Sequence, residues 1–361
     1  MDTQLLQCYL AIRTTNGSRM KAILFRQHGG PEVLEYTDAP TPSIRANEVL
    51  VRVRACALNH LDLWVRGGLP NVPIPLPHIP GSDIAGEIAE IGADVTTVKV
   101  GQKVVLAPGV SCGKCAACLA GFDNRCRQFS NLGYIIDGGC AEFVKCPEVN
   151  CMPYPENLSF EQAASISLVF QTAWHMLLTR AQLQPGEDVL ILGAGSGVGS
   201  AAIQIAALFG ARIIATAGNT AKLEKAKQLG AQHLINHKTQ KIRDEVRRIT
   251  NKRGVDVVFE HVGTATWDES VASLAVGGRL ITCGATTGYD AKIDLRFLFT
   301  RQLSLLGSYM GTKSELAALM KLVISGHLKP VIDRTFPLAS CAEAHRYLES
   351  GEQFGKVVLT V

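Results

Sequence analysis

The chain has 361 residues and a formal net charge of +4 at pH 7, and 47% of its residues are hydrophobic while 19% are charged. This length favours two domains, and this composition is typical of a globular protein rather than a disordered one. The scattered charges and their small excess argue against a nucleic-acid-binding protein, and no apolar stretch is long enough to span a membrane. Two abundant residue types need an explanation, the 34 glycines and the 11 cysteines.

The N-terminal residues 1–19 are expected to form a poorly ordered leader, because the segment 20–25 has the character of a first strand. The chain starts without the basic residues of a signal peptide. The odd number of cysteines, seven of them isolated in the sequence, argues against a secreted disulfide framework. We therefore expect a cytoplasmic protein.

Short β-branched segments, interrupted by glycine and proline, fill the region from about residue 20 to residue 155. Such spacing predicts an all-β barrel or sandwich. The strands expected in this region are 20–25, 48–53 and 102–106.

From about residue 186 to residue 307, strands alternate with helices, a pattern that predicts βαβ units and a parallel sheet. The strands expected here are 188–192, 212–217, 255–259 and 279–283. The helices expected between them are 201–209 and 222–229. After this region we expect one helix over 314–325 and a final strand over 356–360.

A glycine-rich loop follows the apolar strand at 188–192 and precedes an apolar helix. Glycines there permit a tight turn and let the backbone approach a pyrophosphate, which sits at the helix N-terminus. The strict G-x-G-x-x-G phase is not met, because Val198 or Ser200 stands where the last glycine belongs. The strand–loop–helix setting still predicts a dinucleotide site. Its residues are Gly193, Gly195, Ser196, Gly197, Val198 and Gly199.

The second strand of this unit ends without the acidic residue that usually binds the ribose 2′-OH of NAD. The next acidic residue, Glu224, lies inside the expected helix, while Lys222 and Lys225 lie close to the strand end. These lysines could instead simply cover the helix surface. We favour NADP over NAD, with Asn219 and Lys222 among the cofactor-binding residues.

Four cysteines fall within fifteen residues, at spacings typical of a metal site: Cys112, Cys115, Cys118 and Cys126. Four thiolates in one loop predict a closed tetrahedral zinc site that leaves no position for a substrate. An iron–sulfur cluster is an alternative, but the last spacing is seven residues and no proline follows Cys126. Disulfides are another alternative, which a reducing compartment disfavours. We expect one structural zinc per chain.

Together, the glycine loop and the cysteine segment resemble the medium-chain dehydrogenase/reductase family, which includes the zinc alcohol dehydrogenases and the quinone oxidoreductases. The resemblance covers about residues 20–361. Further matching motifs lie at 81–87, 91–92, 100–104 and 355–359.

The resemblance implies an α/β protein that combines a GroES-like β-barrel with a Rossmann-type, doubly wound parallel sheet. The GroES-like catalytic domain would comprise residues 20–168 and 309–361 and would carry the zinc lobe at about 108–128. The Rossmann NAD(P)-binding domain would comprise residues 169–308.

The same resemblance implies that the family's catalytic zinc site has lost its ligands. The position of the first cysteine ligand holds Asn59, the His-Glu pair is replaced by Ser82-Asp83, and the last ligand falls near Leu168. The quinone oxidoreductase branch likewise has Asn at the first position and lacks this metal. A second metal held in a non-standard way is an alternative. Its soft or imidazole ligands would come from Cys56, His60, His78 and Asp83.

Without the catalytic zinc, the reduction of a quinone or an activated alkene is easier than the oxidation of an alcohol. Removing a hydride from an alcohol requires alkoxide character, which a metal supplies by lowering the pKa of a bound hydroxyl to about 7. Reducing a quinone or an activated alkene needs less, because hydrogen-bond donors can hold the resulting phenolate or enolate until solvent protonates it. We therefore expect an NADPH-dependent reductase of quinones, enones or related carbonyl compounds.

Two alternatives stay open. One is an alcohol dehydrogenase or aldehyde reductase that uses a proton relay or an unusual metal, and the other is a non-catalytic NADPH-binding protein. In either case we expect a small-molecule ligand and a homodimer or homotetramer, with no nucleic-acid or membrane partner.

The candidate catalytic residues are Asn59, His60, Asp62 and Thr172. Asn59 is the first candidate for positioning the substrate or the nicotinamide. The resemblance implies that the pair Gln171-Thr172 starts the helix leading into the cofactor domain. Three further cofactor-binding candidates follow later sheet strands, where parallel sheets bind ligands: Val262, Cys283 and Gly284. The resemblance also implies that Lys356 contacts a cofactor phosphate.

Overall fold

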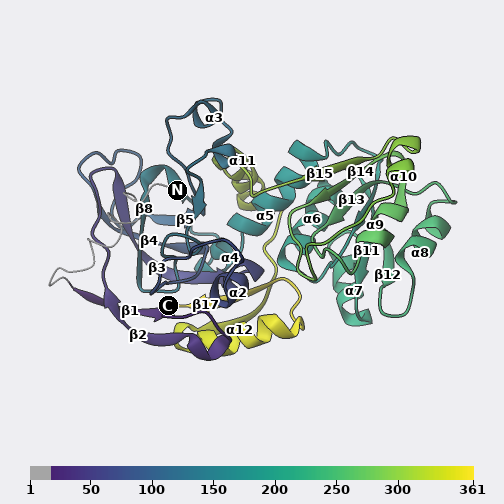
Figure 1. The fold of residues 1–361 in the computed structure, drawn as a ribbon. Coiled ribbons are helices and arrows are strands. Elements are labelled where there is room, and N and C mark those ends of the chain that lie inside the picture. Colours follow the sequence, from purple (N-terminus) through teal and green to yellow (C-terminus); the bar gives the residue numbers. More distant parts are fainter. Residues whose placement is uncertain (1–17) are drawn as a thin grey trace.

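The computed structural model describes residues 18–361, so nearly all of the expected leader lies outside the described residues. These residues form two units that lie side by side, each built on its own sheet (Figure 1). The two helices α5 (Ser167–Trp174) and α11 (Lys313–Ile324) lie where the units meet. No helix within residues 18–361 is both long and apolar enough to cross a membrane.

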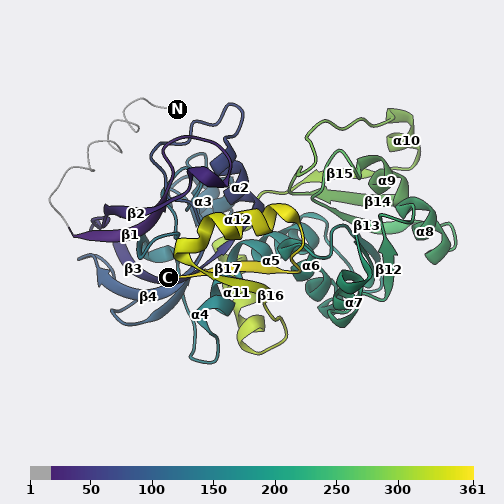
Figure 2. The ribbon, with the colours of Figure 1, turned by 90° about the horizontal axis from the view of Figure 1, so that it is seen from below.

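The first unit is a β-rich structure around a seven-stranded sheet in the order β16-β17-β3-β4-β5-β9, with β8 also paired to β3. All neighbouring strands are antiparallel except β16 and β17. The strands are β3 (Glu48–Leu58), β4 (Asp83–Ile91), β5 (Lys103–Leu106), β8 (Phe143–Pro147), β9 (Cys151–Pro153), β16 (Ile332–Pro337) and β17 (Lys356–Thr360). Because β17 pairs with β3, the end of the chain completes a sheet that its first third began. Figure 2 shows this returning segment in yellow.

Smaller elements complete this unit. Two short sheets pair β1 (Arg19–Leu24) with β2 (Glu35–Pro40) and β6 (Gly109–Val110) with β7 (Ser130–Asn131). The helices of the unit are α2 (His60–Gly67), α3 (Ala116–Leu119), α4 (Phe160–Ala164) and α12 (Cys341–Ser350). The helical turns are η1 (Pro31–Val33), η2 (Asp123–Arg125), η3 (Glu148–Asn150) and η5 (Leu338–Ser340).

The second unit has a six-stranded parallel sheet in the order β12-β11-β10-β13-β14-β15. The strand order reverses between β10 and β13, which makes the carboxyl ends of these two strands the ligand-binding crevice of such a sheet. Its strands are β10 (Asp188–Ile191), β11 (Arg212–Ala217), β12 (His233–Asn236), β13 (Val255–Glu260), β14 (Leu274–Thr282) and β15 (Ser304–Gly307). Its helices are α6 (Gly197–Leu208), α7 (Thr220–Gln228), α8 (Ile242–Ile249), α9 (Trp267–Ser273) and α10 (Leu295–Thr300). The turn η4 (His175–Arg180) links α5 to this unit.

The structure confirms the expected fold class and the expected change from a β-rich region to alternating strands and helices. Helix α6 begins at Gly197 rather than near residue 201, because the glycine loop itself forms the first turn. Strand β14 begins at Leu274, earlier than the expected residue 279. The expectation that Gln171 and Thr172 start a helix is wrong, because α5 begins at Ser167 and both residues lie in its middle.

Substituting Phe259 tests the core of the parallel sheet. Phe259 is fully buried on β13, and the Phe259→Ala variant should lose about 3–5 kcal/mol of unfolding free energy because it leaves a cavity. Phe299→Ala removes the same group from a side chain that is 66% exposed and should change stability by less than about 0.5 kcal/mol. Urea unfolding of both variants measures the difference, and equal shifts would contradict this account of the core.

Candidate active site

Sheet register brings three polar residues together where the two units meet. Asn59 directly follows β3, Asp83 begins β4 and Lys356 begins β17. Val357 pairs with Leu58, and Asp83 pairs with Ala57, so both neighbouring strands start beside the end of β3. The side chains of all three residues therefore meet at one corner of the sheet.

These three side chains form a closed, buried network. Lys356 Nζ donates to Asn59 Oδ1 at 2.6 Å and to Asp83 Oδ2 at 2.8 Å, while Asn59 Nδ2 donates to Asp83 Oδ2 at 3.0 Å. Asp83 is fully buried, and Lys356 is only 3% exposed. A charge at such depth is tolerated because it is paired and hydrogen-bonded. We call Asn59, Asp83 and Lys356 the ammonium network.

Asp62 fixes the backbone around this network. Its Oδ2 accepts from the Asn59 amide N–H at 2.7 Å, and its Oδ1 accepts from the Gly81 amide N–H at 2.9 Å. Burial raises the pKa of this carboxyl to about 6. The bond to Asn59 is one half of a capping box at the start of α2. Asp62 thus fixes the backbone of Asn59, whose side chain belongs to the ammonium network.

His60 is the first residue of α2 and is half-buried. Burial lowers the pKa of its imidazole, and the nearby His261 and Lys356 lower it further. The ring is therefore neutral at pH 7.

Helix α5 meets the ammonium network at its first turn. The Leu168 amide N–H donates to Asp83 Oδ1 at 2.7 Å, so Asp83 satisfies a backbone donor that the helix start leaves free. One turn further on, Thr172 is 5% exposed, and its hydroxyl has no hydrogen-bond partner among the described residues. Thr172 thus offers a free hydroxyl group on the helix that carries Leu168.

The glycine loop forms the tight strand-to-helix turn that its sequence predicts. Gly193 has a positive φ of 57°, and Ser196 caps α6 by accepting from the Gly199 amide at 2.9 Å. A Cβ atom on Gly199 would lie 2.4 Å from the Gly193 carbonyl oxygen, so close strand–helix packing requires glycine there. Gly199 therefore has the packing role of the last glycine in the motif, although it lies one residue after the position that the motif assigns to that glycine.

A cavity of about 260 Å³ opens between this loop and the end of β11. It is basic, because Lys222 and Lys238 line it and no Asp or Glu does. His237 also lines it, but burial and the two lysines lower the pKa of its imidazole. Asn219 also lines the cavity and caps α7 by accepting from the Lys222 amide at 2.9 Å. Two of the expected cofactor residues, Asn219 and Lys222, therefore face the same space as Gly193, Gly195 and Ser196.

A larger cavity, about 700 Å³, lies between the end of α2 and the carboxyl ends of β13 to β15. Its lining is mostly apolar and includes large rings and small residues: Trp64, Leu69, Pro70, Trp267, Cys283, Gly284 and Tyr289. The expected cofactor residues Cys283 and Gly284 therefore face a space shared by both units. Burial raises the pKa of the Cys283 thiol to about 12, so this thiol stays protonated.

Sequence reasoning did not include His261, which follows β13 beside Val262. Its Nε2 lies 2.9 Å from the Leu192 carbonyl oxygen and 3.4 Å from Ser196 Oγ, next to the glycine loop. A polar residue at the carboxyl end of a central parallel strand was the available signal. Asp83 was considered only as a metal ligand, and the structure gives it a lysine partner. The ammonium group of Lys356 is part of the ammonium network, and the expected contact of Lys356 with a cofactor phosphate stays a prediction.

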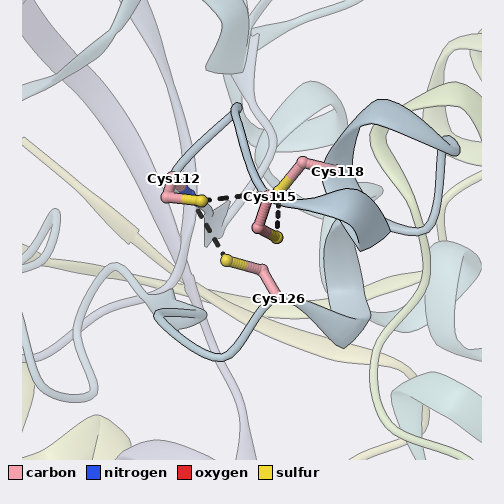
Figure 3. A group of neighbouring side chains, drawn as sticks. All are labelled: Cys112, Cys115, Cys118 and Cys126. Atoms are coloured by element: carbon pink, nitrogen blue, oxygen red, sulfur yellow. Dashed lines mark hydrogen bonds between the residues drawn. The ribbon is translucent and has the colours of Figure 1, made fainter.

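The four cysteines of the lobe converge on one point (Figure 3). Their sulfur atoms all lie within 4.8 Å of one another, and Cys115 and Cys118 are 3.6 Å apart. A tetrahedral zinc with bonds of about 2.3 Å places its sulfur ligands about 3.8 Å apart, so the cluster fits this ion. The amides of Cys112 and Gln128 point at Cys126 Sγ, at 3.5 and 3.3 Å, and support a thiolate there.

The alternative second metal site finds little support within residues 18–361. There, the four lobe cysteines form the only group of three or more potential ligands close enough to hold an ion. Cys56 Sγ lies 3.8 Å from Cys140 Sγ, and Asp83 is bonded to Lys356. The proposed ligands Cys56, His60, His78 and Asp83 thus do not converge.

Family models match both units of the chain. The model for the alcohol dehydrogenase GroES-like domain matches residues 45–156, and the model for zinc-binding dehydrogenases matches residues 197–325. Human quinone oxidoreductase is 31% identical over 353 residues, which cover 96% of this chain and 99% of that protein. An NAD-dependent alcohol dehydrogenase of Sulfolobus acidocaldarius is 33% identical, with 95% and 100% covered.

Solved structures agree with these matches. A crystal structure described as an NAD-dependent alcohol dehydrogenase is 48% identical, covers 95% of this chain and 100% of its own, and superposes with a TM-score of 0.92. A crotonyl-CoA carboxylase/reductase is 29% identical, with a TM-score of 0.89 and coverage of 95% and 88%. The chain belongs to the medium-chain dehydrogenase/reductase family. It is an NAD(P)-dependent oxidoreductase of small molecules.

Metal analysis tests the assignment of the cysteine lobe. Because only this cluster has converging ligands within the described residues, the purified protein should contain one zinc per chain, and Cys118→Ser should lose it. Cys283→Ser, which changes a cysteine outside the lobe, should retain the metal. Elemental analysis reports the stoichiometry, while a brown iron-containing protein or two zinc ions per chain would contradict the assignment.

Proposed function

We propose that the chain is an NADPH-dependent reductase that transfers a hydride to a quinone, an enone or a related carbonyl compound without a catalytic zinc. The observation that carries this proposal is the ammonium network. Asn59 and Asp83 occupy positions that the family resemblance assigns to ligands of the catalytic zinc, and they hold the Lys356 ammonium instead. Two positions that the resemblance links to a metal ion therefore bind a positive charge that the chain itself supplies.

The ammonium network suits the stabilisation of an oxyanion. An ammonium has three N–H donors, and the described contacts of Lys356 use two of them, to Asn59 and Asp83. The third donor and the Thr172 hydroxyl are available for a substrate oxygen. Donors held rigidly in a buried site stabilise developing negative charge more strongly than water does. Solvent then protonates the phenolate or enolate that results.

When bound, the nicotinamide cofactor supplies the hydride. The residues of the chain have three tasks in this scheme. Gly193, Ser196 and their loop hold the cofactor phosphates, and the ammonium network holds the substrate oxygen. The cavity of about 700 Å³, which is lined by other residues, provides apolar space at the carboxyl ends of β13 to β15. Its aromatic lining favours a flat, largely apolar molecule such as a quinone.

The basic cavity at the glycine loop supports NADPH over NADH. A 2′-phosphate there would meet Lys222 and Lys238 and no carboxylate. The expected residues Val198, Gly197 and Gly199 belong to the first turn of α6, which would bind the pyrophosphate. A cytoplasmic location and a homodimer or homotetramer stay predictions from the sequence.

A second candidate is an NAD-dependent alcohol dehydrogenase. It is favoured by one specific observation, namely that the 48% identical crystal structure carries that description. This activity would require a means of forming an alkoxide, and an ammonium paired with a carboxylate lowers a hydroxyl pKa far less than a metal ion does. Two zinc ions per chain together with NAD-dependent oxidation of an alcohol would favour it over the reductase.

Cofactor preference should depend on Lys222 and Lys238. Replacing either by Ala removes a charged donor to the 2′-phosphate, so the KM for NADPH should rise about 10- to 100-fold while the KM for NADH changes little. Lys227→Ala is a matched control, because Lys227 lies on the same helix, is exposed and does not line this cavity. Steady-state kinetics with both cofactors checks this, and tighter use of NADH by the wild type would contradict it.

The reductase activity itself is tested with 9,10-phenanthrenequinone and simple enones. The purified protein should consume NADPH with one of them, and the double variant Lys356→Met/Asp83→Asn should lose about 10²- to 10³-fold in kcat. The double change removes the ammonium without leaving an unpaired buried carboxylate. Lys99→Met, at an exposed lysine, is the control. An unchanged kcat in the double variant would contradict the role of the ammonium network.

A further inference from the structure

The cysteine lobe touches the helices of the candidate active site through the segment between Cys118 and Cys126. This segment carries η2, and Figure 1 shows the lobe with α3 lying against α11 where the units meet. Asp123 binds the first residue of α11 twice, with Oδ2 accepting from Lys313 Nζ at 2.8 Å and Oδ1 accepting from the Lys313 amide at 3.1 Å. The lobe therefore holds the start of α11 by both side chain and backbone.

The next residue, Asn124, reaches the end of α5. Its Nδ2 lies 3.2 Å from the Tyr309 carbonyl oxygen and 3.3 Å from His175 Nε2. His175 Nδ1 lies 2.9 Å from Glu315 Oε1. Because a carboxylate only accepts, Nδ1 carries the proton and Nε2 accepts from Asn124. Asn124 is 9% exposed and His175 is 2% exposed, so these contacts are shielded from water.

Helices α5 and α11 are in turn bonded to each other. Gln171 Nε2 donates to the Thr312 carbonyl oxygen at 2.8 Å, four residues before His175 on the same face of the helix. Glu315 accepts from His175 and from the Thr179 hydroxyl on one side, and from the Thr312 amide at 2.7 Å on the other. Three consecutive turns of α5 and η4 are thus fixed to the start of α11.

The opposite end of α5 is bonded to the ammonium network through Leu168 and Asp83. Thr172 lies between the two ends. One short helix therefore joins the residues that the cysteine lobe holds to the residues proposed to bind the substrate oxygen. We propose that Asp123 and Asn124 are positioning residues, through which the metal-binding lobe sets the place of α5 relative to the ammonium network.

The lobe with its four cysteines therefore positions α5 in addition to stabilising its own segment of the chain. A metal in the lobe fixes the segment 118–126, and Asp123 and Asn124 pass that constraint to α11 and α5. Loss of the metal should therefore disturb Thr172 and Asp83 although neither is a ligand. The catalytic consequence rests on the proposed function, whereas the structural coupling does not. The experiment measures both separately.

Asn124→Ala removes the contacts to His175 and Tyr309 while leaving all four cysteines. The variant should retain one zinc per chain and show faster hydrogen–deuterium exchange confined to residues 167–180 and 309–316. Its kcat with NADPH and phenanthrenequinone should fall about 10- to 100-fold, with the KM for NADPH within about twofold of the wild-type value. Leu119→Ala, at a 77% exposed position of the same lobe, should change none of these quantities.

Metal removal provides the coupling test. Chelation of wild-type zinc should speed exchange over 167–180 as much as Asn124→Ala does, and chelation of the variant should add nothing further there. Lys313→Met tests the other contact from outside the lobe, and it should loosen 309–316 with the metal retained. Unchanged exchange in both variants, or an increase spread over the whole chain, would overturn the inference. Loosened exchange with no turnover of any quinone or enone would keep the coupling and overturn only the proposed function.

Discussion

The candidate active site depends on one buried ion pair, between Lys356 and Asp83. Removing either partner would leave an uncompensated charge in the interior, at a cost of about 3–5 kcal/mol, so the two residues are constrained to occur together. The pair also joins three strands that are distant in the sequence, because each residue begins a strand beside the end of β3. The same ion pair thus belongs to the candidate active site and also joins the strands of the sheet.

The two abundant residue types of the sequence serve different purposes in this arrangement. The glycines at 193–199 form the turn that we propose holds the cofactor phosphates, and Gly199 is required by close packing rather than by its place in a motif. The four lobe cysteines lie away from the ammonium network, yet η2 connects them to it through α11 and α5. Two sites with separate sequence signals are therefore parts of one junction between the units.

Much of the fold could be predicted from the sequence, because hydrophobic periodicity is a local property. The parallel strands and the glycine turn are examples, as β10, β11 and α6 lie close to the expected residues. The partners of Asn59 could not be predicted in this way, since Lys356 lies 297 residues away and depends on the register of β17. His261 shows the same limit, because its contacts with Leu192 and Ser196 depend on β13 lying beside β10, which no local pattern encodes. Thr172 was a candidate only through the family resemblance.

The position of β17 also has a consequence for biosynthesis. A ribosome makes β3 early and β17 last, so the ammonium side chain reaches its carboxylate partner only after the whole intervening α/β unit has emerged. Until then, Asp83 at the start of β4 lacks its cation, and the edge of β3 that β17 will occupy is unpaired. All six strands of the parallel sheet precede β17 in the chain, so they leave the ribosome before the ammonium network can form.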